Sequence, residues 1–495
     1  MVEEKVILQV LAEQQEYVQS YEPQKWVGRY EETLFELDSP LAQVVIGVRR
    51  SGKSTLCHKV LLEHHVKYGY ANFDDDRLAK LETEDLNTVL SCIYQVYGTD
   101  IKYIFLDEIQ DVDGWHLFVN RLLRSNLHLV VTGSNAKLLS GELATHLTGR
   151  YNEIHLFPFS FYEYCMFHHV DLAGITTKAD AERKRAFLDY IADGGFPEMQ
   201  NMRNKRGYVQ SLMEAIVTKD IQRRFNIRNV NALRKIANHL VNNVCQEVNY
   251  DDLAKILSMS DVTVKKYVDY LRQAFLIQLL TKHSFKSKER IRNAKAYIVD
   301  SGLQNNRNNV FAAENIGWRL ENVVYIELLR RCTNSFLDIY YYKESSRSKE
   351  IDFVVCNQDK AVELIQVAYD IEGEKTFKRE TDSLIRASSV LRCDKLTLIA
   401  FTITRDYKVD GKSICIVSAI DWLLGRQQPS ITIVFPSVDK AYLFCLPLRP
   451  CEQFIHHEGD GTVARNVAGG SEAVHRDVEG NHKGLHVGIE AQDRG

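Results

Sequence analysis

No uninterrupted apolar run in this sequence of 495 residues approaches the roughly 18–20 residues that a membrane-spanning helix needs. The start, MVEEKVILQVLAEQQEY, is acidic and lacks the basic segment and small-residue cleavage site of a secretion signal. The ten cysteines include no CxxC pair, which argues against a zinc ribbon or a disulfide framework. We therefore expect a cytoplasmic protein with reduced thiols and no membrane partner.

Charge and proline are also limited. The 62 Lys and Arg residues nearly balance 66 Asp and Glu, for a net charge of -4, which argues against a wholly basic nucleic-acid coat protein but allows a local basic patch. Four of the 8 prolines lie in the last 67 residues, so the end of the chain differs in kind from the rest. The length itself suggests about three domains.

Apolar runs alternate with helical patterns in the first third of the chain. After an amphipathic, helical stretch over 1–40, the runs are VVIG, YGYANF, YIFLDE, LHLVVTGS and YNEIHLF. Apolar strands separated by helices predict a parallel sheet covered on both faces. The pattern from 161 to 229 is helical, broken by a turn at DGGFPE.

The strongest motif is VVIGVRRSGKST, which fits G-x4-G-K-[ST] between an apolar run and the helical pattern LCHKVLLEHH. Its glycines let the loop curl so that backbone N–H groups face phosphate oxygens, and the helix N-terminus adds partial positive charge. Lys53 would reach the β- and γ-phosphates of ATP, and Ser54 would ligate Mg2+. The predicted nucleotide-binding residues are Gly47, Val48, Arg49, Arg50, Ser51, Gly52, Lys53, Ser54 and Thr55.

YIFLDEIQ supplies a second set of groups at 54 residues beyond Lys53. Asp107 ends a buried strand and would hold Mg2+, and Glu108 would polarise the attacking water. Asn135, after the third apolar strand, could contact the γ-phosphate or that water. Arg150 could act on the phosphates of its own chain or of a neighbouring subunit, or could be a surface residue.

Within the loop, Arg49 and Arg50 are equally compatible with phosphate ligands and with solvent-facing side chains. A serine, Ser134, precedes Asn135 and shares its alternatives, since a strand is often followed by a polar turn.

A second compact unit begins at YDDLAKIL, which reads as a helix followed by a turn and the helix DVTVKKYVDYLRQAF, with Ser260 as N-cap. FLIQLL and AKAYIVD then read as two strands around a charged tip, which predicts a winged helix. Residues 255–295 contain ten Lys and Arg against three Asp and Glu. The predicted DNA-binding residues are Lys265, Lys266, Arg272, Lys286, Lys288 and Arg290. The alternative is a protein-docking module.

The C-terminal part shows a helix, four strand-like runs and a helix before the last run. Glu321, Asp352 and Gln366 lie at the spacing of a restriction-endonuclease-like core, which places such residues around a divalent cation. Gln366 and Ala368 replace the glutamate and lysine of the E-x-K element. We therefore expect a degenerate site without nuclease activity. Glu363 could substitute as a ligand, but strand alternation places it opposite Gln366.

The order of motifs resembles the prokaryotic AAA-type ATPases of the archaeal-ATPase-like group. The matching segments are GVRRSGKST, IFLDEIQ, VVTGSN, LTGR, FPFSFYEY, GGFPE and KDIQRRF. This resemblance implies an α/β P-loop NTPase with a RecA-like parallel sheet and a helical lid, followed by a winged helix and a restriction-endonuclease-like α/β domain. It also implies ATP and Mg2+ as ligands and a role in DNA transactions or defence.

Five segments follow from these patterns. They are an ATPase core with N-terminal helices (1–165), a helical lid (166–228), a winged helix-turn-helix (229–305), a nuclease-like domain (306–427) and a largely disordered tail (428–495). The first hypothesis is an ATPase whose nucleotide state controls DNA engagement. The alternatives are a non-hydrolysing ATP-gated adaptor for protein partners and an ATP-regulated endonuclease. A homo-oligomer is possible in each case.

Overall fold

The computed structural model describes residues 2–134, 147, 149–284, 294–305, 316–333, 335–344, 349–409 and 411–426. The chain divides into a compact unit, Met1–Asp439, and a second unit, Lys440–Gly495, and the described residues all belong to the first. The predicted disordered tail, 428–495, lies outside the described residues, so that prediction stays open.

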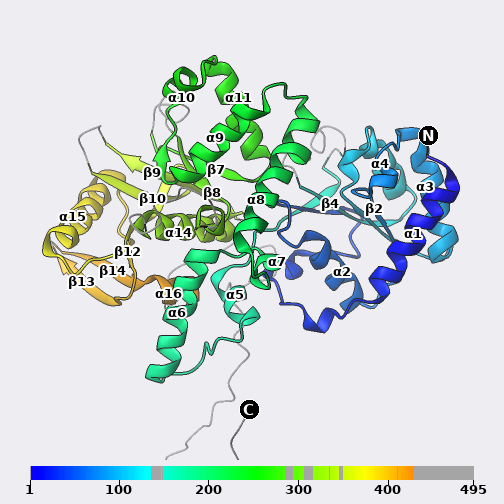
Figure 1. Ribbon diagram of the computed structural model, residues 1–495. Helices are drawn as coiled ribbons and strands as arrows, with labels where there is room; N and C mark the ends of the chain where they lie inside the picture. The colour runs from blue at the N-terminus through cyan, green and yellow to red at the C-terminus, as the bar shows by residue number, and fades with distance from the viewer. Residues whose placement is uncertain are drawn as a thin grey trace, which may run out of the picture. The chain divides into compact units, whose positions relative to one another are not determined.

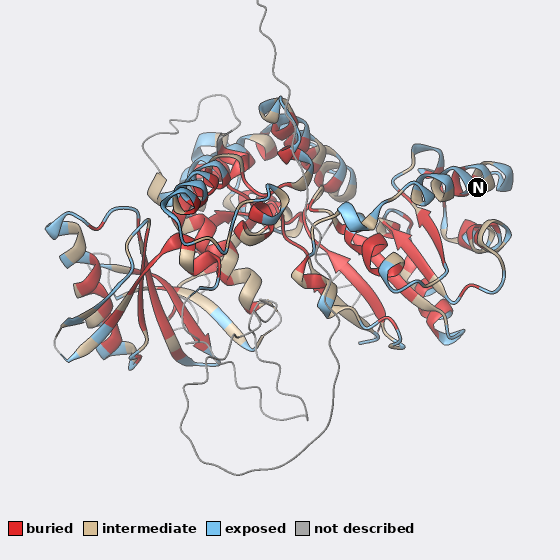
Figure 2. Ribbon diagram, turned by 90° about the horizontal axis from the view of Figure 1, so that it is seen from below, coloured by how far each residue is buried: buried red, intermediate tan, exposed pale blue. Residues whose placement is uncertain are grey.

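The first sheet consists of five parallel strands in the order β2-β3-β4-β1-β5. Figure 1 labels β2 and β4 of this sheet. The strands are β1 (Ala42–Ile46), β2 (Tyr68–Asn72), β3 (Tyr103–Asp107), β4 (His128–Gly133) and β5 (Tyr151–His155). The central ones are buried (Figure 2), as expected for apolar strands covered on both faces. The predicted parallel sheet is confirmed, and its parallel strands bring their carboxyl ends to one edge.

Four helices accompany this sheet: α1 (Glu4–Gln19), α2 (Lys53–Glu63), α3 (Leu86–Tyr97) and α4 (Trp115–Arg124). Helix α1 packs on α3 and β2 through Ile7, Val10 and Leu11. The predicted helical stretch over 1–40 is wrong beyond Gln19. Only short 3-10 turns follow, Pro23–Lys25 and Tyr30–Leu34, since a proline removes the backbone donor that a continuing helix would need.

A helical region follows the sheet. It comprises α5 (Phe161–Phe167), α6 (Thr177–Asp193), α7 (Pro197–Gln200), α8 (Lys205–Ala215) and the π-helical segment η7 (Ile216–Arg223). The predicted turn lies between α6 and α7, where Gly194 has φ of +74°. A Cβ on Gly195 would lie 2.2 Å from the Phe159 carbonyl oxygen. The paired glycines therefore allow close approach of backbone segments as well as a turn.

The next elements are α9 (Val230–Asn242), β6 (Gln246–Glu247), α10 (Tyr250–Leu257), α11 (Asp261–Gln273), β7 (Ile277–Thr281) and β8 (Ala294–Ile298). The three strands form an antiparallel sheet in the order β6-β8-β7. Ser260 caps α11, because its Oγ accepts a hydrogen bond from the Thr263 N–H at 3.1 Å. The helix–turn–helix and the two strands stand where the sequence predicts them, and their charged tip, 285–293, lies outside the described residues.

The C-terminal sheet has six strands in the order β13-β14-β12-β11-β10-β9. Its elements, preceded by the short α13 (Gly302–Asn305), are α14 (Ile316–Cys332), β9 (Leu337–Lys343), β10 (Glu350–Asn357), β11 (Lys360–Ala368), α15 (Glu374–Leu391), β12 (Leu396–Ala400), β13 (Arg405–Val409), β14 (Lys412–Ser418) and α16 (Ala419–Leu423). Phe353 and Ile365 pack in the cluster with α14, whereas Val354 and Leu364 pack with Leu384 of α15. The two helices therefore cover opposite faces. Strands β13 and β14 were not predicted.

A buried ion network ties these parts together within the compact unit. The Arg29 Nε donates to Glu163 Oε1 at 2.8 Å, and Arg330 of α14 lies 3.5 Å from Glu31 Oε1 and 4.0 Å from Glu163 Oε2. Arg330 also donates to the Pro158 carbonyl at 2.8 Å. Two buried arginines thus neutralise two buried glutamates that lie far from Arg330 in the sequence.

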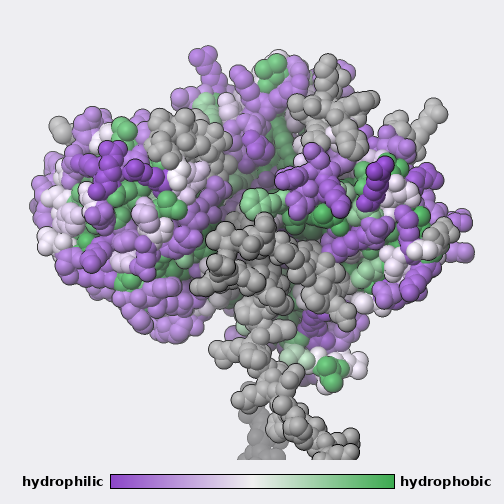
Figure 3. Space-filling view, turned by 180° about the vertical axis from the view of Figure 1, so that it is seen from behind, coloured by the Kyte–Doolittle hydropathy of each residue, from purple (hydrophilic) through white to green (hydrophobic). Residues whose placement is uncertain are grey.

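The surface of the described residues is mixed in hydropathy. The described residues visible in Figure 3 are mostly hydrophilic, and hydrophobic ones form separate patches among them. Within the described residues, the helices are all too short or too polar to cross a membrane.

Candidate functional site

The loop between β1 and α2 carries the predicted phosphate-binding residues. Gly47 must lack a side chain, because a Cβ there would lie 2.1 Å from the Leu156 carbonyl oxygen. Gly52, just before α2, is left-handed with φ of +98°. Ser51 is buried, and Thr55 is exposed on the first turn of α2. The backbone of this loop is therefore shaped by its close approach to Leu156, directly after β5, and by two glycines.

Lys53 is the first residue of α2 and is only 5% exposed. Its Nζ donates to the Val48 carbonyl at 3.4 Å and lies 3.5 Å from Glu108 Oε1. A buried ammonium with weak, long contacts within the loop is placed to bind an anion instead.

Asp107 ends β3 and lies beside the loop. Its Oδ1 accepts hydrogen bonds from Ser54 Oγ at 3.0 Å and from the Thr132 hydroxyl, and its Oδ2 accepts one from Tyr70 Oη at 3.0 Å. Burial and the neighbouring Glu108 raise the pKa of Asp107 to about 6, although the hydroxyl donors oppose this shift. Ser54 and Asp107 together offer the hard oxygen ligands that fit Mg2+.

Glu108 follows in a left-handed conformation, φ +56°, which turns the chain sharply at the end of the strand. Its N–H donates to Thr132 Oγ1 at 3.0 Å, and its carboxylate accepts from Gln110 and from the Ser134 N–H. Burial favours a raised pKa, but Lys53 and Arg49 outweigh it, so the pKa of Glu108 lies below its usual value. Glu108 is therefore an anion held beside Lys53.

The other predicted site residues do not all lie beside the phosphate-binding loop. Ser134 lies at the end of β4, while Asn135 lies outside the described residues. Arg150 is exposed, and its carbonyl accepts from the Ala42 N–H, at the start of β1. The loop follows the other end of β1, so the structure does not bring the Arg150 backbone to the loop of its own chain, and the role of Arg150 stays a prediction.

The two loop arginines bind the helical region and so are not merely solvent-facing. Arg49 donates to both carboxylate oxygens of Asp220 in η7 at 2.9–3.2 Å. Arg50 lies 3.7 Å from Glu198 of α7, and its guanidinium stacks 5.0 Å from the Tyr208 ring centroid. These contacts connect the phosphate-binding loop to three elements of the helical region.

Asp220 is the functional candidate that the sequence interpretation missed. It is buried, and its Oδ1 also accepts from Ser134 Oγ at 3.2 Å. A second carboxylate, Asp74, binds both Arg49 and Lys219 at 3.2 Å. The signal available in the sequence was the segment KDIQRRF, which contains Lys219 and Asp220, but no spacing rule relates it to the loop.

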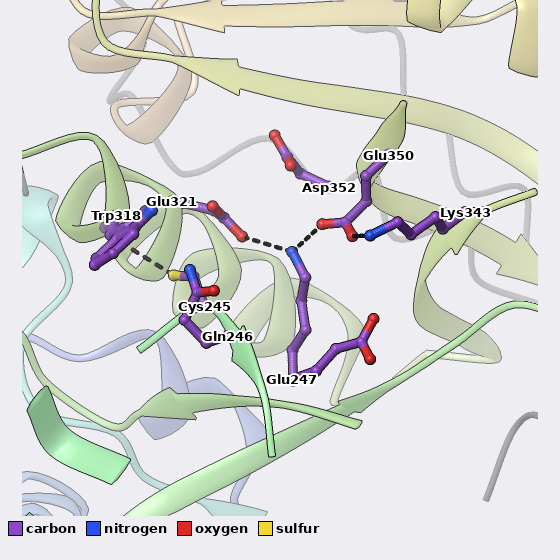
Figure 4. A pocket seen from close by; sticks show the side chains of 9 residues that line it. Cys245, Gln246, Glu247, Trp318, Glu321, Lys343, Glu350 and Asp352 are labelled. Atoms are coloured by element: carbon purple, nitrogen blue, oxygen red, sulfur yellow. Dashed lines mark hydrogen bonds and ion pairs between the residues drawn. The ribbon is translucent and has the colours of Figure 1, made fainter. Parts of the chain in front are cut away.

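A second polar site lies between the β6-β8-β7 sheet and the C-terminal sheet. This pocket has a volume of about 410 Å³ and is lined by Cys245, Gln246, Glu247, Lys295, Trp318, Glu321, Lys343, Glu350 and Asp352. Figure 4 shows Glu321 and Glu350 directed toward one nitrogen between them. That nitrogen is the Lys295 ammonium, which lies 3.4 Å from Glu321 Oε1 and in contact with Glu350 Oε1.

The predicted grouping of Glu321, Asp352 and Gln366 is only half right. Glu321 and Asp352 line the pocket, but the Gln366 amide points to the other face of the sheet and donates to Glu380 of α15 at 2.9 Å. The cause is a bulge in β10 between Ile351 and Val354, which turns Asp352 to the face that α14 covers. Glu363 also avoids the pocket, since it binds Thr397 and Lys395.

The pKa values of two groups in this pocket, Lys295 and Asp352, are raised. Burial lowers the pKa of a lysine, but Glu321 and Glu350 outweigh it and raise the pKa of Lys295. Burial and Glu321 raise the pKa of Asp352 well above its usual value, although Lys295 opposes the shift. A protonated lysine therefore lies within a group of carboxylates, one of which tends to be neutral.

The predicted DNA-binding surface carries less free positive charge than its number of Lys and Arg residues suggests. On α11, Lys265 pairs with Asp261 at 3.0 Å and Arg272 with Asp269 at 2.7 Å, whereas Lys266 is exposed and has no ion pair among the described residues. Lys295 belongs to the buried pocket and cannot add to the surface charge. The remaining predicted residues, Lys286, Lys288 and Arg290, lie outside the described residues.

Comparison with known families divides the chain into three matched parts. Residues 39–165 match the AAA domain family. Residues 184–314 and 317–419 match two families described as domain of unknown function, DUF8612 and DUF4143. With its parallel sheet and phosphate-binding loop, the N-terminal part is thus an AAA-type P-loop ATPase domain.

Two full-length relatives extend this assignment. An uncharacterized protein from Methanocaldococcus jannaschii is 32% identical over 370 residues, covering 73% of this chain and 81% of its own. An uncharacterized protein from Haemophilus influenzae is 33% identical over 406 residues, covering 78% and 95%. This chain belongs to the family that includes these two proteins.

Solved structures give weaker similarities. The Walker-type ATPase of Pyrococcus abyssi matches with a TM-score of 0.38 and 15% identity, over 55% of this chain and 93% of its own. The Thermotoga maritima RuvB Holliday junction branch migration motor matches with a TM-score of 0.25 and 18% identity, over 48% and 81%.

Proposed function

We propose that this chain is a Mg2+-dependent ATPase whose nucleotide state controls how residues 229–305, acting as a winged helix, engage DNA. One observation carries the proposal: a single loop that contacts both the hydrolytic groups and the helical region. Lys53 lies beside Glu108, while Arg49 in the same loop binds Asp220. A phosphate that enters the loop would therefore change both the contact of Lys53 with Glu108 and the contact of Arg49 with Asp220.

The hydrolytic part rests on charge and position. Lys53 would bind the β- and γ-phosphates, and the ionised Glu108 would accept hydrogen bonds from the attacking water. Ser54 and Asp107 would hold Mg2+, which supplies neutralising charge to the phosphates when bound. Asn135 remains a proposed contact to the γ-phosphate or the water.

The oligomer is part of this proposal. Arg150 is exposed at the edge of the sheet opposite the loop, which supports a role on a neighbouring subunit's nucleotide. An arginine supplied in this way stabilises charge on the transferring phosphoryl group. The homo-oligomer would then be required for turnover.

The test is phosphate release with and without DNA. Lys53→Ala should abolish nucleotide binding, whereas Glu108→Gln should bind ATP but hydrolyse it about 100–10,000-fold more slowly. Asp113→Asn, which neutralises an exposed carboxylate five residues further on, is the matched control and should behave as wild type. Absence of hydrolysis by the wild-type protein would overturn the proposal, and hydrolysis indifferent to DNA would overturn its DNA half.

A specific observation favours a second candidate, an ATP-gated adaptor for a protein partner. Ile256 at the end of α10 is 72% exposed and Val262 at the start of α11 is 56% exposed. Their apolar surface lies beside the turn of the helix–turn–helix, where Lys265 already has an acidic partner. Ile256→Ser would abolish partner binding in the adaptor and leave the salt dependence of DNA binding unchanged in the DNA-engaging ATPase.

A further inference from the structure

The pocket around Lys295 holds a cation of its own. Four carboxylates line it together with this lysine from β8: Glu247 of β6, Glu321 on α14, and Glu350 and Asp352 on β10. Lys295 is 5% exposed, so carboxylate oxygens take the place of water around its ammonium. A buried charge of this kind is stable only where opposite charges surround it.

The resemblance to nuclease-like cores implies a divalent cation at Glu321 and Asp352, and the residues present do not fit one. The expected third ligand, Gln366, lies on the opposite face, bonded to Glu380. Glu321 Oε1 is already engaged by Lys295 at 3.4 Å and by Tyr297 Oη at 2.7 Å. No group of three or more His, Cys, Asp or Glu among the described residues is arranged to hold a metal ion.

We infer that Lys295 is the resident cation of this pocket and stands in place of a divalent cation, so that the carboxylates, which are not arranged around a metal ion while the ammonium is present, can close on one only when it is removed. The ammonium lies between Glu321 and Glu350, where a divalent ion would need their oxygens at roughly 2.0–2.6 Å. Both cations cannot occupy this position. Without Lys295, the remaining carboxylates repel one another and would favour a hard divalent cation.

A neighbouring lysine provides a matched control. Lys343 lines the same pocket but lies at its rim, with its side chain 30% exposed and its Nζ 3.6 Å from Glu350 Oε2. Lys343→Met removes the same charge from the pocket as Lys295→Met. In Lys295→Met the ammonium between Glu321 and Glu350 is lost, whereas in Lys343→Met it remains.

The experiment measures Mn2+ bound per full-length chain without nucleotide, by equilibrium dialysis. The P-loop is the same in every variant, so any Mn2+ held there cancels in the comparison. Lys295→Met should bind one Mn2+ more than the wild type and Lys343→Met, and Lys295→Met combined with Asp352→Asn should lose it. No additional Mn2+ in a folded Lys295→Met protein would overturn the inference.

A second comparison does not depend on the folding of Lys295→Met. Glu321→Gln in the otherwise unchanged chain should bind as much Mn2+ as the wild type, because Lys295 excludes the metal from both. If Glu321→Gln binds one Mn2+ fewer than the wild type, the pocket holds a metal ion despite Lys295 and the inference is wrong. Should Lys295→Met be unstable, Mn2+ should raise its Tm and leave that of Lys343→Met unchanged.

Discussion

Arg49 in the phosphate-binding loop donates to both carboxylate oxygens of Asp220, which lies 171 residues further along the chain. The bond is largely buried and joins the loop to the π-helical segment that ends the helical region. π-helical turns are often found at functional sites. The pair therefore connects the phosphate-binding loop directly to η7.

Asp220→Asn should break this connection. The amide keeps the shape but removes the charge that holds Arg49, and we expect a loss of about 3 kcal/mol in the free energy of unfolding. Hydrogen exchange in α8 and η7 should change when an ATP analogue binds to the wild type and should no longer respond in Asp220→Asn. Asp74→Asn also removes an Arg49 partner, but a more exposed one, and should retain the response. An unchanged response in Asp220→Asn would exclude coupling through this pair.

Arg150→Ala should inactivate a homo-oligomer without weakening ATP binding. We expect kcat to fall about 1,000-fold if the guanidinium serves a neighbouring subunit. Mixing Arg150→Ala with Lys53→Ala chains should restore part of the activity, since each supplies what the other lacks. A fully active Arg150→Ala protein would show that this residue is only a surface arginine.

Lys266→Ala should reduce DNA binding in a salt-dependent way. Each phosphate contact contributes about -0.9 to the slope of log K against log salt, so losing Lys266, which has no ion pair among the described residues, should lower the steepness by about that amount. Lys265→Ala should have less effect, because Asp261 already neutralises this lysine. Equal effects of the two substitutions, measured by titration at several salt concentrations, would contradict the geometry of α11.

Asp300 should make the protein less stable as the pH rises. Its carboxylate accepts from the Gly195 and Gly302 N–H groups at 2.6 and 2.9 Å, yet burial raises its pKa to about 7. The folded protein therefore retains this proton at pH values where the unfolded chain, with a pKa near 3.8, has lost it. Stability from this group is full below pH 4 and falls through pH 7, by about 4 kcal/mol.

Asp300→Asn tests this sign. The amide cannot ionise, so the difference in Tm between pH 5 and pH 8 should shrink relative to the wild type, even if the variant is less stable at both. Asp189 is an exposed acid on α6 whose ion-pair partner is Arg185 at 3.9 Å, and Asp189→Asn should leave the pH dependence unchanged. The prediction fails if Asp300→Asn and the wild type lose equal stability over this range.

Local motifs made the nucleotide site predictable. Lys53 and Ser54 follow from a loop flanked by a strand and a helix, and Asp107 follows from another parallel strand of the same sheet, whose carboxyl end must reach the same edge. The helix–turn–helix also follows from local patterns, including the Ser260 cap. In each case, the information lies within a few residues of the group it positions.

Groups that meet across long sequence distances were not predictable in this way. Lys295 was counted among the residues of a basic surface, since composition does not show that Glu321 and Glu350 enclose it. Phe353 pairs with Ile365 in the β10–β11 register, so a regular ladder continued by one residue would set Asp352 opposite Gln366 and direct both to one face. The bulge in β10 directs them to opposite faces, and no residue in that strand is of a type that predicts a bulge.

Arg330 has a consequence for how the chain is made. Its guanidinium is the partner of Glu31 and lies near Glu163, two acids that belong to the N-terminal part. A ribosome that has completed the nucleotide-binding sheet has already made Arg29, which binds Glu163 and lies 4.0 Å from Glu31, but has not yet made the second arginine of the network. Until helix α14 emerges, the nascent domain therefore has one arginine for two buried glutamates, and a shortened chain ending before this helix would keep that deficit.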